Sequence, residues 1–117
     1  MTRPRPRTYS EDDVRARLAQ LPGWRYGDGC ISRLYETDGW PTTILLVNQI
    51  AFLAEAAWHH PDLSVSWAKV TVKLTTHSEH GITDKDFELA HRIEEAALWR
   101  PARGGALEGT PNKFVMR

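Results

Sequence analysis

The chain has 117 residues, enough for one domain with a modest core, and its 41% apolar and 26% charged residues are typical of a soluble globular protein. Lysine plus arginine and aspartate plus glutamate each number 15, and this balance argues against direct binding of nucleic acid or of a membrane. The longest apolar-rich run, residues 44–58, contains polar side chains and is too short to cross a bilayer. The N-terminus lacks the apolar core of a signal peptide, and the single cysteine, Cys30, cannot form an internal disulfide, so we expect a cytoplasmic protein.

The chain begins with a basic arm that leads into a helix. Residues 1–9 carry arginines spaced by prolines, and we expect this arm to be flexible (Arg3, Arg5 and Arg7). Ser10 and Asp13 then have the spacing of a capping box, in which a serine oxygen accepts from the third helical N–H. The sequence therefore predicts a helix that starts after Ser10 and ends at Pro22-Gly23.

A hairpin is predicted after the first helix. Residues 24–28 and 31–37 read as strands, and they flank Gly27-Asp28-Gly29, a sequence typical of a tight turn. We expect two antiparallel strands, with Trp24 and Tyr26 on the same face of the first.

The second helix, predicted over residues 41–59, is apolar on far more sides than a surface helix usually is. Its apolar positions include Ile44, Leu45, Leu46, Val47, Ile50, Ala51, Phe52, Leu53, Ala54, Ala56 and Ala57. A helix that is apolar on most sides must be buried on most sides. In so small a chain we expect one face to pack on the sheet and another on a second subunit, so the sequence predicts a homo-oligomer.

Two more strands are predicted after Pro61, over residues 63–67 and 69–77. The second alternates clearly, and the side chains that should face the core are Val70, Val72, Leu74 and Thr76. On this pattern His77 points away from the core, at the exit of the strand.

A third helix is predicted to begin at a second capping box, formed by Thr83 and Asp86, and to end at Arg100-Pro101. The cap alone is a sufficient structural role for Asp86. Residues 100–117 form a C-terminal extension that either packs loosely or adds a short edge segment. The order α-ββ-α-ββ-α predicts an α+β fold, a four-stranded antiparallel sheet with helices packed on one face.

The end of the second helix places a carboxylate and two imidazoles beside a forced break in the backbone. Glu55 and His59 are four residues apart, so we expect them to lie in contact on one helix face. Pro61 disfavours the α conformation for His60, so the helix should end there. Glu55 and the C-terminal carbonyls would both favour the charged form of His59, which suits a general acid near neutral pH. The alternative is an exposed histidine that only caps the helix.

Other polar residues suggest weaker chemistry. His77 and His80 could join His59 and His60 in a zinc site. Against this, the sequence has no thiol pair and no H-E-x-x-H motif, and adjacent histidines point in different directions, so we expect no metal. Cys30 has no histidine nearby in sequence to activate it as a nucleophile.

Read together, these residues resemble the pterin-4a-carbinolamine dehydratase family. The pattern is Glu55, three residues, His59-His60-Pro61, five residues, Trp67, nine residues, His77, eight residues and Asp86. The resemblance covers roughly residues 10–97, so we expect a dehydratase-like domain over residues 10–99 and an extension over residues 100–117.

The resemblance implies a lyase that needs no cofactor. Such an enzyme removes water from 4a-hydroxytetrahydropterin and gives quinonoid dihydropterin, which a reductase recycles after aromatic amino acid hydroxylation. The three histidines of the family correspond to His59, His60 and His77. His59 and His77 would act as acid and base, in an order left open, while His60 would position the substrate or assist.

The resemblance also implies residues that bind the pterin or orient a histidine, namely Glu55, Pro61, Trp24, Thr76 and Asp86. Family members pair across a dimer and can form tetramers through the long helix, which implies a homodimer or homotetramer through residues 41–58 and the sheet edges. One departure is Trp58, since the residue before the histidine pair is often Asn or Asp in this family.

Two alternatives to a dehydratase stay open. Animal members of the family also serve as a dimerisation cofactor for a homeodomain transcription factor, so the chain could be a binding module without activity. The intact set of three histidines argues against that alternative. The other alternative is a pterin-binding protein linked to molybdopterin metabolism, which the sequence does not separate from the first hypothesis.

Overall fold

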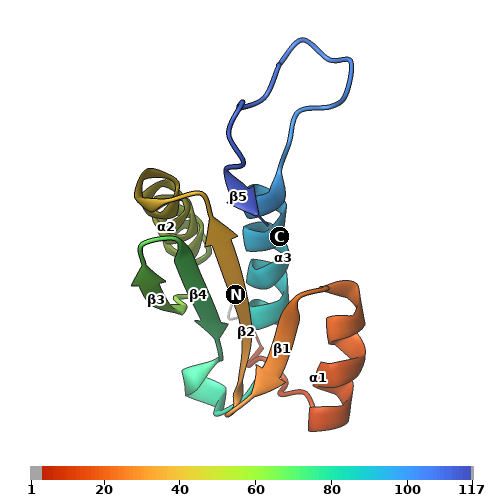
Figure 1. Cartoon of the computed structure of the whole chain (residues 1–117). Helices are drawn as coiled ribbons and strands as arrows, with labels where there is room; N and C mark the ends of the chain where they lie inside the picture. The colour runs from red at the N-terminus through yellow and green to blue at the C-terminus, as the bar shows by residue number, and fades with distance from the viewer. Residues whose placement is uncertain (1–3, 117) are drawn as a thin grey trace.

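An antiparallel sheet forms the middle of the protein, in a computed structural model that describes residues 4–116 (Figure 1). Its main strands, in spatial order, are Trp24–Gly27 (β1), Cys30–Thr37 (β2), Lys69–Leu74 (β4) and Asp62–Ser66 (β3). The hairpin prediction is confirmed, with Trp24 opposite Arg33 in the pairing of β1 with β2. The α+β class is confirmed as well.

The predicted alternation along β4 is also confirmed. Val70, Val72, Leu74 and Thr76 are all buried. They pack under two long helices, Trp40–Ala57 (α2) and Asp84–Leu98 (α3), which lie together on one side of the sheet (Figure 1). Burial of this apolar face is the main source of stability for the fold.

The first helix, Glu11–Arg17 (α1), is shorter than predicted and lies beside β1 (Figure 1). Its predicted cap is confirmed, because the Ser10 hydroxyl accepts from the N–H of Asp13 at 3.2 Å. A 3-10 turn over Leu18–Gln20 replaces the predicted last helical turn before Pro22.

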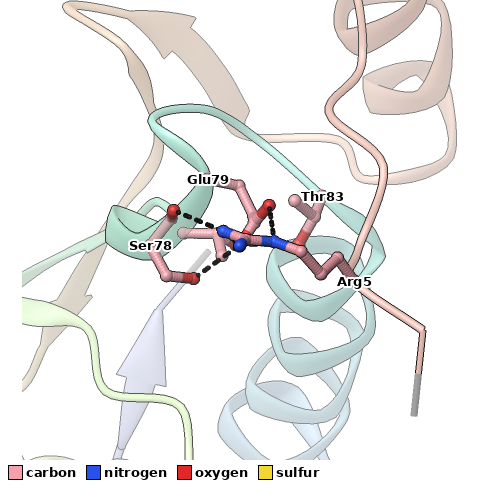
Figure 2. A network of polar contacts seen from close by, with 5 residues as sticks. Arg5, Ser78, Glu79 and Thr83 are labelled. Carbon is pink, nitrogen blue, oxygen red and sulfur yellow. Dashed lines mark hydrogen bonds and ion pairs between the residues drawn. The ribbon is translucent and has the colours of Figure 1, made fainter.

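The N-terminal arm contacts the body of the protein on the segment that precedes α3. The Arg5 guanidinium donates to the Glu79 carboxylate at 3.0 and 3.2 Å and to the Ser78 carbonyl at 3.4 Å (Figure 2). The hydrogen bond from Arg5 holds the pKa of Glu79 below its ordinary value. Arg3 lies outside the described residues, and the flexibility of the arm stays a prediction.

The second helix ends earlier than predicted, and the prediction that it extends to residue 59 is wrong. Trp58 adopts the left-handed conformation, with φ 53° and ψ 47°, and turns the chain out of the helix. His59 N–H donates to the Ala54 carbonyl at 3.1 Å, and Trp58 N–H donates to the Glu55 carbonyl at 3.2 Å. These two bonds form a Schellman motif, so both histidines lie beyond the helix.

The third helix begins at the predicted capping box, which is confirmed. The Thr83 hydroxyl accepts from a backbone N–H of the first turn, and the Asp86 side chain accepts from the N–H of Thr83. A short 3-10 turn, His77–Glu79 (η2), connects β4 to this helix.

The C-terminal extension adds a short strand, Val115–Met116 (β5), which corrects the predicted four-stranded sheet. It pairs with the end of β2, opposite Glu36 and Thr37. The chain reaches it through a long loop that projects from the body (Figure 1). Asp38 fixes the residue before β5, because its N–H donates to the Phe114 carbonyl at 2.9 Å and its carboxylate accepts from the Phe114 N–H. None of the helices within residues 4–116 is long and apolar enough to span a membrane.

Candidate active site

Three connections meet at one pocket of about 330 Å³. They are the turn after α2, the segment from the end of β4 into η2, and the first turn of α3. The lining side chains belong to Trp58, His59, His60, Thr75, Thr76, His77, Ser78 and Lys85. The three predicted catalytic histidines are therefore brought together, although His59 and His77 are 18 positions apart in the sequence. A larger hollow of about 660 Å³ between α2 and α3 contains none of the predicted site residues.

Asp86 lies fully buried beneath this pocket. One oxygen, Oδ2, accepts from the Thr83 N–H at 2.9 Å and from the Thr76 hydroxyl at 2.8 Å. The other oxygen, Oδ1, lies 2.6 Å from Nε2 of His59. The helix cap thus fixes a carboxylate that in turn fixes an imidazole.

This pairing sets the chemistry available to His59. A carboxylate accepts hydrogen bonds, so the ring places its Nε2–H toward Asp86, and Nδ1 is the nitrogen that can exchange a proton with a ligand. Because Oδ2 of Asp86 is held by Thr76 and Thr83, the carboxylate is fixed and the His59 ring is oriented before any ligand arrives. The prediction that Asp86 caps its helix is confirmed, whereas no local pattern in the sequence indicated its bond to His59.

Glu55 pairs with His60, and the predicted contact with His59 is wrong. Its Oε1 lies 2.7 Å from Nε2 of His60. The physical reason is the left-handed Trp58, which takes His59 off the helix face that carries Glu55. The His60 and Glu55 side chains are 50% and 69% exposed. This pair is therefore far more exposed to solvent than the pair of His59 and Asp86, whose side chains are 12% and 0% exposed.

His77 begins η2 and is exposed, which confirms that it points away from the core. Its ring lines the same pocket as His59, and Thr76 joins the two, since it lines the pocket and donates to Asp86. His80 is exposed and is not part of the lining.

Of the predicted substrate-binding set, Thr76 lines the pocket, Asp86 and Glu55 contact the lining histidines, and Trp24 and Pro61 are outside the lining. Trp24, in β1 of the hairpin, is buried, and its indole N–H donates to Oε1 of Glu94 in α3 at 3.0 Å. Pro61 is half-buried directly after His60 and is not in the lining. Their roles at a substrate stay predictions.

Sequence reasoning did not single out Thr75, Ser78 and Lys85, which also line the pocket. The sequence could have indicated Lys85, because it lies next to Asp86 in the first turn of α3, which the capping box brings to the site. Within residues 4–116, no three side chains among histidine, cysteine, aspartate and glutamate come together as ligands for a metal.

Comparison with known proteins gives consistent matches over this region. The family model described as "Pterin 4 alpha carbinolamine dehydratase" matches residues 7–96. A protein of Aquifex aeolicus (strain VF5) is 52% identical over 89 residues, which cover 76% of this chain and 90% of that protein. One of Roseiflexus sp. (strain RS-1) is 44% identical over 86 residues, covering 74% and 92%. The names of both proteins contain the words pterin-4-alpha-carbinolamine dehydratase.

A solved structure agrees with these sequence matches. The crystal structure of "transcriptional coactivator/pterin dehydratase" from Brucella melitensis superimposes with a TM-score of 0.72 at 30% sequence identity. The match covers 75% of this chain and 96% of that one.

Proposed function

This chain belongs to the pterin-4-alpha-carbinolamine dehydratase family of hydro-lyases, and we propose that it removes water from 4a-hydroxytetrahydropterin to give quinonoid dihydropterin. The observation that carries the proposal is the 2.6 Å contact of His59 with buried Asp86, in a pocket that His77 also lines. Two imidazoles at one pocket can supply a proton donor and a proton acceptor.

The proposed reaction needs two proton transfers. One histidine protonates the 4a-hydroxyl, so that the C4a–O bond breaks and water leaves. The other accepts the proton of the neighbouring ring N–H, whose electron pair then forms the new C=N bond. His59 and His77 fill these two roles in an order left open, and each transfer of this kind contributes about 100- to 10,000-fold.

The remaining residues act around this pair. Asp86 is fully buried, so its role is to orient His59 through their hydrogen bond rather than to touch the pterin. Thr76 supports the same carboxylate. Glu55 holds His60, which positions the substrate.

The test is a stopped-flow dehydration assay with synthetic 4a-hydroxytetrahydropterin. We expect the wild-type protein to accelerate water loss over buffer and His77→Ala to lose at least about 100-fold in kcat/KM. His77 is exposed, so the substitution should leave unfolding unchanged. His91→Ala, on α3 away from the pocket, is the matched control and should keep full activity. No acceleration by the wild-type protein would overturn the proposal.

We place this reaction in the cytoplasm, in the recycling of the tetrahydrobiopterin cofactor after aromatic amino acid hydroxylation. The Brucella protein is described as a transcriptional coactivator as well as a dehydratase. For this chain the convergence of His59, His60 and His77 favours the enzyme, because a scaffold that only binds partners needs no oriented imidazoles. A role in molybdopterin metabolism would use the same pocket on another pterin.

We also propose that the protein is a homodimer or homotetramer, assembled through residues 41–58 and the sheet edges. Leu45 and Phe52 on the outer face of α2 are 58% and 69% exposed, which leaves large apolar side chains in water in a lone chain. Light scattering at micromolar concentration should therefore give two or four copies, and Phe52→Glu should reduce that number. A monomeric wild-type protein would contradict the proposal.

A further inference from the structure

The left-handed Trp58 has a conformation that its side chain does not favour. It occupies the position after the last residue of α2, where the Schellman motif requires a positive φ. Glycine fills this position most often and asparagine sometimes, because a Cβ is crowded by the following carbonyl oxygen. A bulky aromatic residue here is an outlier that needs a compensating role.

Packing within the chain does not supply that role. The Trp58 side chain is 76% exposed, so the hydrophobic effect rewards little of its area in the isolated chain. Its ring meets that of His60 edge to face, with centroids 5.1 Å apart and planes at 82°. That contact joins two exposed rings on one wall of the pocket.

The position of Trp58 in the pocket indicates what compensates for its unfavourable backbone conformation. It lines the pocket together with His59 and His77, the two histidines proposed for proton transfer. An indole face in an otherwise polar pocket offers a stacking surface for a flat heterocycle. Polar residues at the same position could hydrogen-bond to a ligand but could not stack on it.

We propose that Trp58 is a substrate-binding residue that stacks on the flat pyrimidinone part of the pterin and holds it against His59 and His77. The inference rests on the function proposed above and names the group that recognises the flat part of the substrate. Recognition by stacking is tolerant of substituents at the ring edge, so this wall selects for the conjugated pyrimidinone part of the pterin rather than for a particular side chain.

The test uses Trp58→Asn, because asparagine fits the left-handed position while removing the indole. We expect the melting temperature to rise by about 2–6 °C as strain is relieved. We expect KM for 4a-hydroxytetrahydropterin to rise about 10-fold with kcat changed much less, since the catalytic histidines stay in place. Trp58→Phe keeps an aromatic face and should restore most of the affinity.

A purely structural role predicts the opposite pattern, a lower melting temperature for Trp58→Asn with KM unchanged, and that result would overturn the inference. Light scattering on the same samples is the control for assembly. A rise in KM that appears only together with a loss of subunits would also overturn it, because Trp58 would then be an interface residue.

A binding experiment separates this inference from the proposed function. Calorimetric titration with oxidised pterin, which is stable, measures stacking without turnover. If the wild-type protein binds pterin and Trp58→Asn binds it about 10-fold more weakly, the inference stands even where the dehydration assay shows no activity. If the wild-type enzyme is active and both proteins bind pterin equally, the inference alone fails.

Discussion

Asp86 and Glu94 are two acidic residues on one helix, α3, and each accepts hydrogen bonds at both oxygens of its carboxylate. The partners of Asp86 are a threonine hydroxyl, a backbone N–H and the ring of His59. The partners of Glu94 all belong to the hairpin of β1 and β2, and they are Trp24, Arg33 and Tyr35.

The difference between the two carboxylates lies in where their partners lead. Every donor to Glu94 is a buried side chain that ties α3 to the sheet. Two partners of Asp86, His59 and Thr76, line a pocket instead. A heavily hydrogen-bonded acidic residue is therefore not by itself the mark of a site in this fold. A functional site is distinguished instead by a hydrogen-bond partner of the carboxylate that can still exchange a proton with a bound ligand.

The largest effect that should sharpen this comparison is expected from Asp86→Asn. The amide has one acceptor oxygen, so it cannot accept from Thr76 and Thr83 on one side and from His59 on the other. We expect kcat to fall about 100-fold as His59 loses its orientation, and the free energy of unfolding to fall by about 1–3 kcal/mol. Stopped-flow dehydration and urea unfolding measure the two effects.

Thr76→Val is the matched control for this prediction. It removes a single donor to Oδ2 and leaves the contact of Asp86 with His59 in place. Its loss of activity should be clearly smaller than that of Asp86→Asn. Equal stability losses in the two variants with full activity in both would mean that Asp86 is only a cap, and the contrast with Glu94 would disappear.

Local patterns predicted much of the fold. The alternation along β4, the serine cap at Ser10, the capping box at Thr83 and the glycine-containing hairpin turn all act within a few residues, and all are present as predicted. The end of α2 was misplaced because nothing in helical periodicity indicates that a tryptophan will adopt a left-handed conformation. That single residue moved the partner of Glu55 from His59 to His60.

Long-range pairs explain what the sequence could not predict. The contact between His59 and Asp86 spans 27 residues, and the bond from Trp24 to Glu94 spans 70. The spacing of the motif identified His59 and Asp86 as members of one site, but only the packing of α3 against β4 and the end of α2 shows that they touch. Glu94 belongs to no motif, and it flanks the apolar face of its helix without a local sign of burial.

A smaller effect, on stability alone, is expected from Glu94→Gln. The amide keeps one acceptor oxygen, which can take the place of Oε1 beside Trp24 and Tyr35, but it carries no charge and puts an NH2 group where Oε2 accepted from the buried Arg33 guanidinium. We expect a loss of about 2 kcal/mol in the free energy of unfolding, with kcat and KM of the folded enzyme unchanged. Tyr35→Phe, which removes one donor and keeps the ion pair, is the control and should cost about 1 kcal/mol. A loss of activity in folded Glu94→Gln would make the two carboxylates alike and break the comparison.

The pH dependence of that loss tests its cause. Burial alone would raise the pKa of Glu94, but the hydrogen bonds from Arg33, Tyr35 and Trp24 outweigh it and hold the pKa below its ordinary value. A carboxyl group whose pKa is lower in the folded than in the unfolded state stabilises the fold above the unfolded value, about 4.3, and loses that contribution as the pH falls through the folded value. Glutamine cannot titrate, so urea unfolding should show a wide stability gap between wild type and Glu94→Gln at about pH 6 that narrows below about pH 4. If the difference in unfolding free energy between the two proteins stays constant with pH, the charge of Glu94 does not contribute to it. Glu94 would then act through its shape and through neutral hydrogen bonds, because acidification removes only the charge.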